Sequence, residues 1–541
     1  MSRARGSRRV ATFVAASNIA RRPGGLRTVV LLSLAVGLTV FAVDGWAVAS
    51  TNRDDVAPAE VGGWEVLHVR SHSAGDLLSA VRTADPSGTQ ALAAVATTAG
   101  SSGGLIAIDA SRIGAVSAWD PAWTGSSREE IGSQLHPEQV GSPIPLRGDL
   151  SIDVDYDQAL GSGAVDLAVA VRDASGLLHT VDLGELRPGP STPTAALPMC
   201  VDAPCALEAF IFTPSPLASR GAGTVTISGA QDSSGDVDLT SAGSDGWRSG
   251  ATSVLVRIPP VATVSVEESG RLVTSFDVEG ESAAVEVADH PTQLPVFVGS
   301  ELVGSGGPAS EATVTGLDGR ALPAQLLGSG VLPRKLGTGA LADLSSALAV
   351  MGSAPTLLDY QVWLAADAPP SIRAALEADG YEVLAAESVD ERLSELALGS
   401  DALALRLFLV AAVVALMIAA GTLLAGTYIT ARRRAYELAA MRSLGADQGV
   451  LVRSGRLEQV ALAFIGTALG LVAGLVGAAI TLPNLLMSVT DVHPAPWFGP
   501  AWLPVLATIV GVLLLLGLVA EVGARRTARL AQPDLLRAVQ E

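Results

Sequence analysis

Residues 430–445 read T-A-R-R-R-A-Y-E-L-A-A-M-R-S-L-G and lie between two long apolar segments, Leu407–Ile429 and Val460–Leu482. Two more apolar segments occupy Leu26–Ala49 and Trp502–Val522. Each of the four is long enough to cross about 30 Å of hydrocarbon as an α-helix. An arginine-rich helix between two such spans belongs at the cytoplasmic face of a membrane. The sequence therefore predicts an integral membrane protein that crosses the bilayer four times.

Arginines predict the orientation of these spans. Seven arginines precede residue 28, six lie within 430–459 and four follow Val522, while 483–501 contains no lysine or arginine. By the positive-inside rule both termini and the 430–459 loop are cytoplasmic. The long segment between the first two spans is then extracytoplasmic, in a multi-pass protein of the cell membrane.

The first span has an alternative interpretation as a cleaved signal peptide, because Ala47-Val48-Ala49 fits a small-residue cleavage site. Its long apolar core favours a membrane span instead. Asp44, near the outer end of this span, is interpreted as an interfacial carboxylate beside Trp46, with an intramembrane relay as the alternative.

Composition limits the possible functions. The net charge of −19 belongs mainly to the outer region, because most cytoplasmic segments are basic, and it argues against nucleic-acid binding. Lys335 is the single lysine, and it lies outside any G-x-x-x-x-G-K-[ST] pattern. This chain therefore lacks a phosphate-binding P-loop, and any ATP-driven work must come from a partner.

The outer region is predicted to be an α/β domain interrupted by a β-sandwich. Short segments that alternate apolar and polar residues, such as S-I-D-V-D-Y-D at 151–157, predict antiparallel strands. The remaining outer sequence mixes helical and strand patterns. The mixed part is expected to contain strands at Trp64–Val69, Leu105–Asp109 and Tyr360–Leu364, and helices at Ala74–Ala84, Ser127–Leu135 and Pro370–Asp379.

The expected fold class is an α-helical membrane protein with four transmembrane helices and a large extracytoplasmic α+β domain that carries a β-sandwich insertion. The expected segments are a cytoplasmic amphipathic segment at 1–25, transmembrane helices at 26–49, 405–429, 460–482 and 502–523, the α/β domain at 50–142 and 261–404, the β-sandwich at 143–260, the cytoplasmic coupling loop at 430–459, an outer loop at 483–501 and a cytoplasmic tail at 524–541.

Few residues suggest chemistry. Cys200 and Cys205, the only cysteines, are spaced C-x4-C on the oxidising side, which favours a disulfide over a metal site. Gly100–Gly104 matches G-x-S-x-G but reads as a Gly/Ser-rich turn. The alternating Asp153, Asp155 and Asp157 favour a solvated strand face over a calcium loop, and His68 with His72 gives only weak support for zinc. We expect no catalytic residues, no metal and no cofactor, and hence no enzyme.

Glycines recur in the third apolar segment at Gly466, Gly470 and Gly474. This spacing predicts a helix face that another helix approaches closely, either within the chain or in a second subunit. The alternative is the ordinary abundance of glycine in membrane helices.

The order of one span, a large outer domain and three further spans resembles the FtsX-like permease family, the MacB-type group of ABC transporter permeases, in its actinobacterial form. The closing residues R-L-A-Q-P-D-L-L-R-A at 529–538 resemble the tail of these permeases. The loop between the second and third spans carries the family pattern most completely. Its matching residues are Arg434, Glu437, Leu438, Met441, Arg442, Leu444, Gly445 and Ala446.

The resemblance implies a permease subunit that couples ATP hydrolysis by a separate ABC ATPase subunit to movement of the extracytoplasmic domain, for export or extraction of a substrate. It implies that residues 434–445 form the coupling helix that contacts the ATPase. It also implies a second permease half, as a homodimer or heterodimer. One alternative is an FtsX-like mechanotransmitter that regulates an extracellular cell-wall hydrolase. Another is a membrane-anchored glycan-binding sensor, which the arginine-rich loop argues against.

Overall fold

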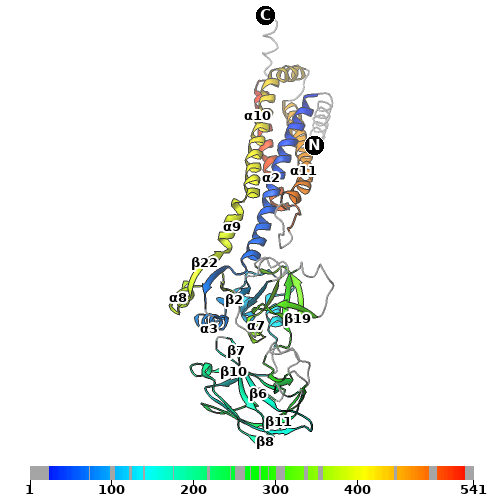
Figure 1. Cartoon of the computed structure of the whole chain (residues 1–541). Coiled ribbons are helices and arrows are strands. Elements are labelled where there is room, and N and C mark those ends of the chain that lie inside the picture. Colours follow the sequence, from blue (N-terminus) through cyan, green and yellow to red (C-terminus); the bar gives the residue numbers. More distant parts are fainter. Residues whose placement is uncertain are drawn as a thin grey trace, which may run out of the picture. The chain divides into compact units, whose positions relative to one another are not determined.

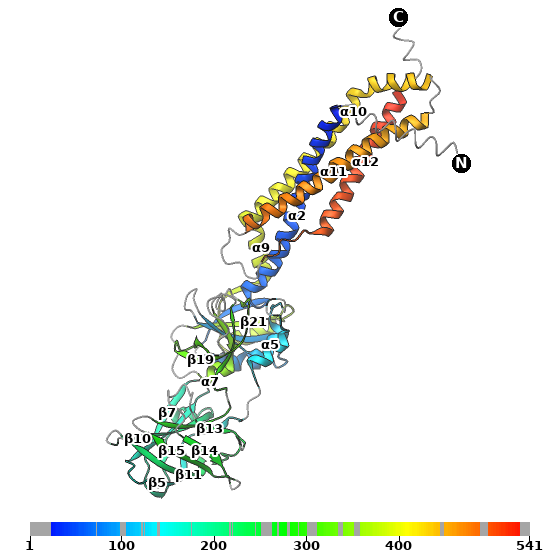
Figure 2. The same ribbon diagram turned by 90° about the vertical axis from the view of Figure 1, so that its right-hand side faces the viewer.

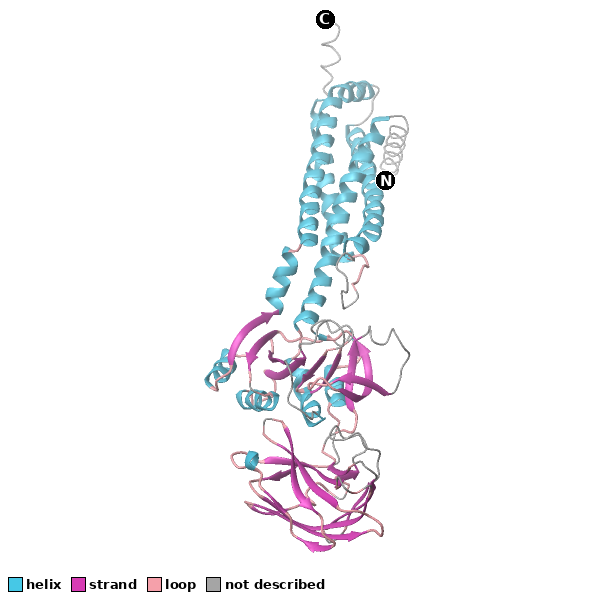
Figure 3. Cartoon of the chain, in the orientation of Figure 1, coloured by secondary structure: helices cyan, strands magenta, loops and turns pink. Residues whose placement is uncertain are grey.

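The computed structural model describes the backbone of residues 23–530, with gaps at 72, 98–103, 121–122, 124, 138–140, 175, 216–217, 219, 244, 250–261, 268–269, 279–281, 290, 300–310, 334–338, 351–357, 444–447 and 487–495. The chain divides into two compact units, Met1–Val56 with Leu393–Glu541 and Ala57–Arg392. The first contains the long helices and the second contains the β-sheets (Figures 1 and 3). The expected fold class is confirmed.

Four helices of the described chain are long and apolar enough to cross a membrane. Their apolar stretches are Arg27–Val61, Ser400–Gly426, Arg456–Asn484 and Trp502–Gly523. They lie in α2 (Pro23–Val61), α10 (Ser400–Ser443), α11 (Gln448–Leu486) and α12 (Trp502–Leu530). The amphipathic segment expected at 1–25 lies almost wholly outside the described residues.

All four helices are longer than the expected spans. Helix α2 continues beyond residue 49 and ends where Gly62, at φ 92°, donates its N–H to the carbonyl of Pro58 at 2.8 Å. A glycine with positive φ is a common helix terminator. Helix α10 likewise runs without a break from the apolar span into the arginine-rich stretch. Much of the expected 430–459 loop is thus helix.

Helix α2 is the central helix of the bundle. Half of its most apolar window is buried, against 11% for α10, 22% for α11 and 28% for α12. Its residues Leu32, Val36 and Val40 share one apolar cluster with Val505 and other residues of α10 and α12. The outward faces of α10 and α12 remain apolar and exposed.

The described part of the second unit begins with a nine-stranded mixed sheet whose strand order is β18-β19-β17-β20-β3-β2-β21-β1-β22. Among its described strand pairs, only β17–β19 and β20–β3 are parallel. Its strands are β1 (Glu65–Arg70), β2 (Ala91–Thr97), β3 (Leu105–Ile108), β17 (Leu294–Gly299), β18 (Glu311–Thr315), β19 (Ala321–Gly330), β20 (Ala340–Asp343), β21 (Leu358–Leu364) and β22 (Glu382–Ser388).

Short helices complete this domain. Those that contribute apolar side chains to the main sheet core are α3 (Ala74–Ala84), α7 (Leu344–Val350) and α8 (Pro370–Ala378). The others beside the sheet are η1 (Ala110–Arg112), α4 (Ile113–Val116) and α5 (Arg128–Leu135), while α9 (Val389–Leu398) links β22 to α10. The predicted start of the 127–135 helix is confirmed, because the Ser127 side chain accepts a hydrogen bond from the Glu130 N–H at 3.1 Å.

The β-sandwich consists of two antiparallel sheets around one apolar core that includes Tyr156, Phe210, Phe212 and Phe276. One sheet contains β4 (Ile144–Leu146), β6 (Val165–Arg172), β7 (Leu178–Glu185), β10 (Cys205–Pro214), β13 (Trp247–Ser249) and β16 (Ala283–Val287). The other contains β5 (Leu150–Gln158), β8 (Gly189–Ser191), β9 (Thr194–Ala195), β11 (Gly221–Asp232), β12 (Gly235–Val237), β14 (Ala262–Val266) and β15 (Leu272–Val278).

The sandwich extends beyond its predicted end at residue 260. Strands β14, β15 and β16 belong to it, and β15 pairs with β11 over its full length. The burial of β15 alternates along the strand, as expected for a sheet with one face on the core. The prediction placed these strands in the α/β domain, although their own alternation matches that of the preceding strands.

Candidate functional site

The candidate coupling residues lie at the end of α10. Arg434, Glu437, Leu438, Met441 and Arg442 are all on this continuous helix, whose last part bends away from its first part in Figure 2. Glu437 and Met441 are four residues apart and therefore share a helix face. Leu444 and Gly445 lie outside the described residues.

The three glycines of α11 lie against α2. A Cβ added at Gly470 would come within 2.7 Å of the Val36 Cβ, and one at Gly474 within 2.6 Å of the Gly37 carbonyl oxygen. A Cβ at Gly466 would meet Leu32 at 2.9 Å. The missing side chains thus permit an α2–α11 approach that no larger residue would allow.

Polar side chains of α2 hold the segment that precedes α12. Asn52 accepts a hydrogen bond from the Trp497 N–H at 2.8 Å and donates one to the Trp497 carbonyl at 3.0 Å. Asp44 accepts from the Ala501 N–H at 2.7 Å, directly before α12 begins. A carboxylate is favourable at a helix N-terminus. Asp44 is only 2% exposed, so this hydrogen bond to the start of α12 is shielded from solvent.

An ion pair connects the beginning of α11 to the later part of α12. Glu521 of α12 pairs with Arg456 of α11 and also with Arg525, one turn further along α12, at 2.5 Å. The bundle is therefore fastened by polar contacts near both ends of α12.

The part of the chain that contains most of α10 together with α11 and α12 matches a known family. Residues 409–531 match the family model described as FtsX-like permease C-terminal. This part of the chain is an FtsX-like permease domain. No curated protein matches the chain. The FtsX-like permease domain supports a membrane permease of an ABC-type system, a class of membrane transport component that generally works with an ABC ATPase.

The long helices are connected to the mixed sheet through two neighbouring strands. Helix α2 leads into β1, and β22 leads through α9 into α10. β1 and β22 are antiparallel neighbours, with Glu65 opposite Ser388. The Val389 N–H also donates to the Trp64 carbonyl at 3.0 Å. Both connections therefore enter the sheet at the same edge.

Two contacts stabilise the connection between the end of α2 and the β1–β22 edge of the sheet. Glu60, in the last turn of α2, pairs with Arg392 of α9, and its side chain is only 11% exposed. Gly62 and Gly63 then pack against Trp363 of β21, where an added Cβ would lie 2.9 Å from the indole side chain. Sequence patterns alone did not indicate either contact, because the partners come from opposite ends of the outer region.

Two buried carboxylates with half-exposed basic partners lie at the ends of the parallel strands β3 and β20. Asp343, which ends β20, accepts from the His136 Nδ1 at 2.9 Å and from the Ser346 N–H at 2.9 Å. Arg82 donates two hydrogen bonds to Asp109, which directly follows β3. The hydrogen bond to Asp343 raises the pKa of His136. Burial raises the pKa of Asp343, but hydrogen bonds led by that of His136 outweigh it and leave the pKa below its usual value.

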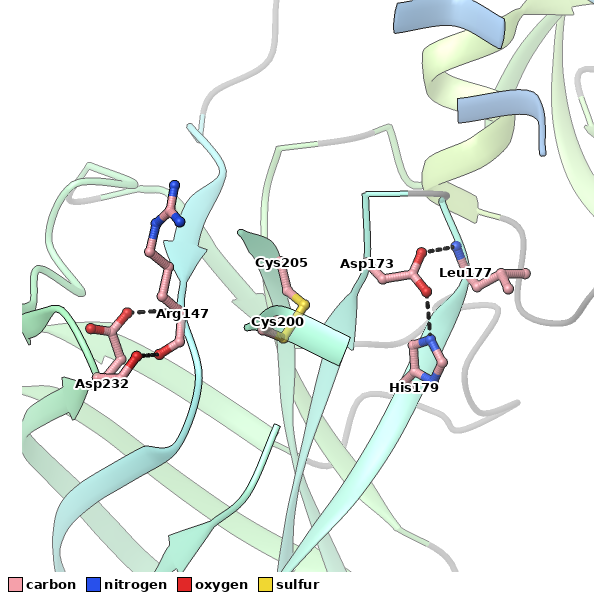
Figure 4. Close-up of a disulfide and its surroundings, with 8 residues drawn as sticks. Arg147, Asp173, Leu177, His179, Cys200, Cys205 and Asp232 are labelled. Carbon is pink, nitrogen blue, oxygen red and sulfur yellow. Dashed lines mark hydrogen bonds and ion pairs between the residues drawn. A yellow bond between two sulfur atoms is a disulfide. The ribbon is translucent and has the colours of Figure 1, made fainter. Parts of the chain in front are cut away.

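The cysteines form a disulfide at one end of the sandwich, between η3 (Pro198–Cys200) and β10 (Figure 4). Their Cα atoms are 5.2 Å apart, and both residues are buried. Nearby, the Asp173 carboxylate binds the Leu177 N–H at 3.0 Å and the His179 Nε2 at 2.7 Å, which holds the β6–β7 turn (Figure 4). These contacts shape the end of the sandwich.

The remaining candidates are not brought together into one site. Asp153, Asp155 and Asp157 are exposed along β5. His68 lies between Asp359 and Glu387, while His72 and residues 100–103 are outside the described residues. Within the described part of the chain, no group of three His, Cys, Asp or Glu side chains is placed to hold a metal ion.

Proposed function

We propose that this chain is the permease subunit of an ABC transporter complex, which couples ATP hydrolysis by a separate ATPase subunit to movement of the extracytoplasmic domain for export or extraction of a substrate. The four helices cross the cell membrane with both chain termini in the cytoplasm. The observation that carries the proposal is the connection of α2 and α10 to adjacent strands, β1 and β22, at one edge of the sheet.

This connection supports transmission of force. Within their apolar stretches, Arg27–Val61 of α2 and Ser400–Gly426 of α10, both helices are continuous and would act as rods. The bend of α10 lies towards its other end, which carries the proposed ATPase contact (Figure 2). The Glu60–Arg392 ion pair and the β1–β22 pairing join the outer continuations of the two rods. A displacement of both helices would therefore be delivered to one place on the mixed sheet.

The other end of α10 supplies the contact with the ATPase. Arg434, Glu437 and Arg442 would make charge contacts with a groove on that subunit, while Leu438, Met441 and Leu444 would pack apolar surface. Gly445 would belong to the same contact. Because α10 is continuous, closure of the ATPase subunits would move the same helix that enters the sheet through α9 and β22.

A second permease half completes the proposed complex, as a homodimer or heterodimer. Only 11% of the apolar window of α10 is buried within the chain, and its exposed face includes Leu407, Val410 and Met417. The second half would cover part of this face and lipid the rest.

The test is co-purification of the ATPase together with ATP turnover in nanodiscs. Glu437→Arg reverses a charge at the proposed contact, and such reversals at interfaces cost several kcal/mol. Met441→Asp places an unpaired charge in the same contact. We expect both variants to lose ATPase binding and coupled turnover while inserting normally into the membrane.

The matched control is Glu377→Arg, the same reversal at an exposed position of α8. It should bind the ATPase like the wild type. Wild-type protein that brings down no ATPase, or variants at Glu437 and Met441 with unchanged binding and turnover, would refute the proposal.

A further inference from the structure

Two arginines from different helices meet at one tryptophan. The guanidinium carbon of Arg53, on α2, lies 5.0 Å from the ring centroid of Trp46, and that of Arg406, on α10, lies 5.5 Å from it. Both distances fall within the range of a cation–π interaction. Trp46 thus brings together two positive charges that the chain holds 353 positions apart.

The charges of this pair are only partly compensated. Arg53 is attracted by its exposed neighbour Asp54 and repelled by Arg406. Among the described residues, neither guanidinium forms an ion pair with a carboxylate. Most other described arginines of the folded domains, such as Arg82 and Arg172, do form one. Two neighbouring cations without a paired anion favour an external anion between them.

The position of the pair identifies the source of that anion. Trp46 packs beside Phe41, Phe408 and Phe498 around an apolar cluster that contains Leu405 and Leu482. Trp497, in the segment that leads into α12, and Trp502, the first residue of α12, are both exposed. Tryptophans gathered where apolar helices begin or end are typical of the level of lipid headgroups.

We propose that Arg53 and Arg406 bind the phosphate of an anionic phospholipid in the leaflet nearest the point where α2 leads into the sheet domain, with Trp46 beneath the headgroup. The planar guanidinium fork matches the oxygens of a phosphate and donates charge-assisted hydrogen bonds to it. A headgroup is favoured over dissolved phosphate because the apolar ends of α2 and α10 hold the site at the bilayer surface. Such a lipid would join these two helices and neutralise the repulsion between their arginines.

This inference rests on the proposed placement of the four helices in a membrane but not on contact with an ATPase. The test is native mass spectrometry of the detergent-solubilised full-length protein, titrated with phosphatidylglycerol or with phosphatidylcholine. The variants are Arg53→Gln, Arg406→Gln and the double substitution. Arg525→Gln is the matched control, because it removes one arginine at the far end of α12.

We expect the wild type to hold one phosphatidylglycerol in preference to phosphatidylcholine, and the double variant to bind it about tenfold more weakly. Arg525→Gln should keep this tightest lipid, and an excess of inorganic phosphate should not displace it. Equal binding by wild type and double variant, or no preference for the anionic lipid, would overturn the proposal. Displacement by inorganic phosphate would show a site for soluble anions instead. A thermal melt of each variant checks folding, and labelling of the membrane topology tests the helix placement separately.

Discussion

Glu60 at the end of α2 forms an ion pair with Arg392 of α9, although 332 positions separate them in the sequence. The pair lies at the corner where β1 begins and β22 ends, and these two strands are hydrogen-bonded neighbours. The chain therefore leaves the helical bundle and returns to it through two segments that an ion pair and strand pairing hold together. The geometry favours movement of α2 and α9 as one piece.

The first prediction tests this junction by cross-linking. Glu60→Cys with Arg392→Cys should be joined by a short, reducible thiol-to-thiol cross-linker, because the parent side chains are in contact. If the helices move together, the cross-linked complex should retain the ATP turnover of the uncross-linked protein. The measurement is turnover in nanodiscs before and after cross-linking.

The control pair is Glu60→Cys with Arg373→Cys, since Arg373 is an exposed residue of α8 that pairs with Glu377 instead. It should not cross-link. A collapse of turnover on closing the 60–392 cross-link, restored by reduction, would mean that α2 and α9 separate during the cycle.

The second prediction concerns the contact between α2 and the glycines of α11, Gly466, Gly470 and Gly474. Gly470→Ala would bring a methyl group within 2.7 Å of the Val36 side chain and 2.8 Å of the Ser33 carbonyl oxygen. Overpacking of this kind costs about 1–3 kcal/mol. We expect a lower apparent melting temperature of the full-length protein in detergent.

Gly517→Ala in α12 is the comparison, because an added Cβ there meets nothing within 4 Å. Alanine favours the helix over glycine, so this variant should be neutral or slightly more stable. Equal melting temperatures for the two variants would argue against tight packing at Gly470.

The third prediction is a pH dependence carried by His136 and Asp343. The pKa of His136 is raised in the folded protein, so its contribution to stability is complete below the unfolded pKa and is lost as pH rises through the folded one. The pKa of Asp343 is lowered, so its contribution is lost as pH falls through the folded value. The pair should thus stabilise the domain most between about pH 4 and pH 6.5.

His136→Gln should remove the loss of stability that the wild type shows as pH rises through the folded pKa of His136. Because about half of the His136 side chain is exposed, the loss should be no more than about 1 kcal/mol. Thermal unfolding of wild type and variant at mildly acidic and mildly alkaline pH provides the measurement. The two proteins should differ more at the acidic pH; an unchanged difference across the range would contradict the assignment.

The fourth prediction concerns topology. Cysteines introduced at Ser233 and Thr490 should react with a membrane-impermeant reagent in intact cells, whereas one at Ser443 should react only after lysis. The arginine distribution is the reason, and Cys200 and Cys205 do not interfere because they are paired. Labelling at Ser443 in intact cells would contradict the four-span orientation and the proposed coupling role.

Local patterns predicted much of this fold. The Ser127 cap, the helix at Ala74–Ala84 and the strand that ends at Leu364 depend on near neighbours in the chain, and all three are present. The end of the sandwich was missed because alternation identifies strands without assigning them to a sheet. β15 joined the sandwich through its pairing with β11, a contact between distant segments.

The site divides in the same way. The glycines of α11 are read directly from spacing, since a helix places residues four apart on one face. The proposed coupling residues at Arg434–Gly445 come instead from the resemblance of that segment to a family pattern. Spacing could not predict which residues of α2 contact those glycines. Nor could it predict the hydrogen bonds between Asn52 and Trp497, or the two arginines at Trp46. Each of them joins segments that are far apart along the chain.

The sequence by itself determined that this protein has four apolar helices, an arginine-rich segment between two of them and a separate outer region, because length, hydropathy and charge act locally on each stretch of chain. Only the tertiary structure decided that α2 is the central helix, that β1 lies beside β22 and that Glu60 meets Arg392. Strand pairing and ion pairing need geometric complementarity between distant residues, and no local pattern encodes which of many compatible partners will meet.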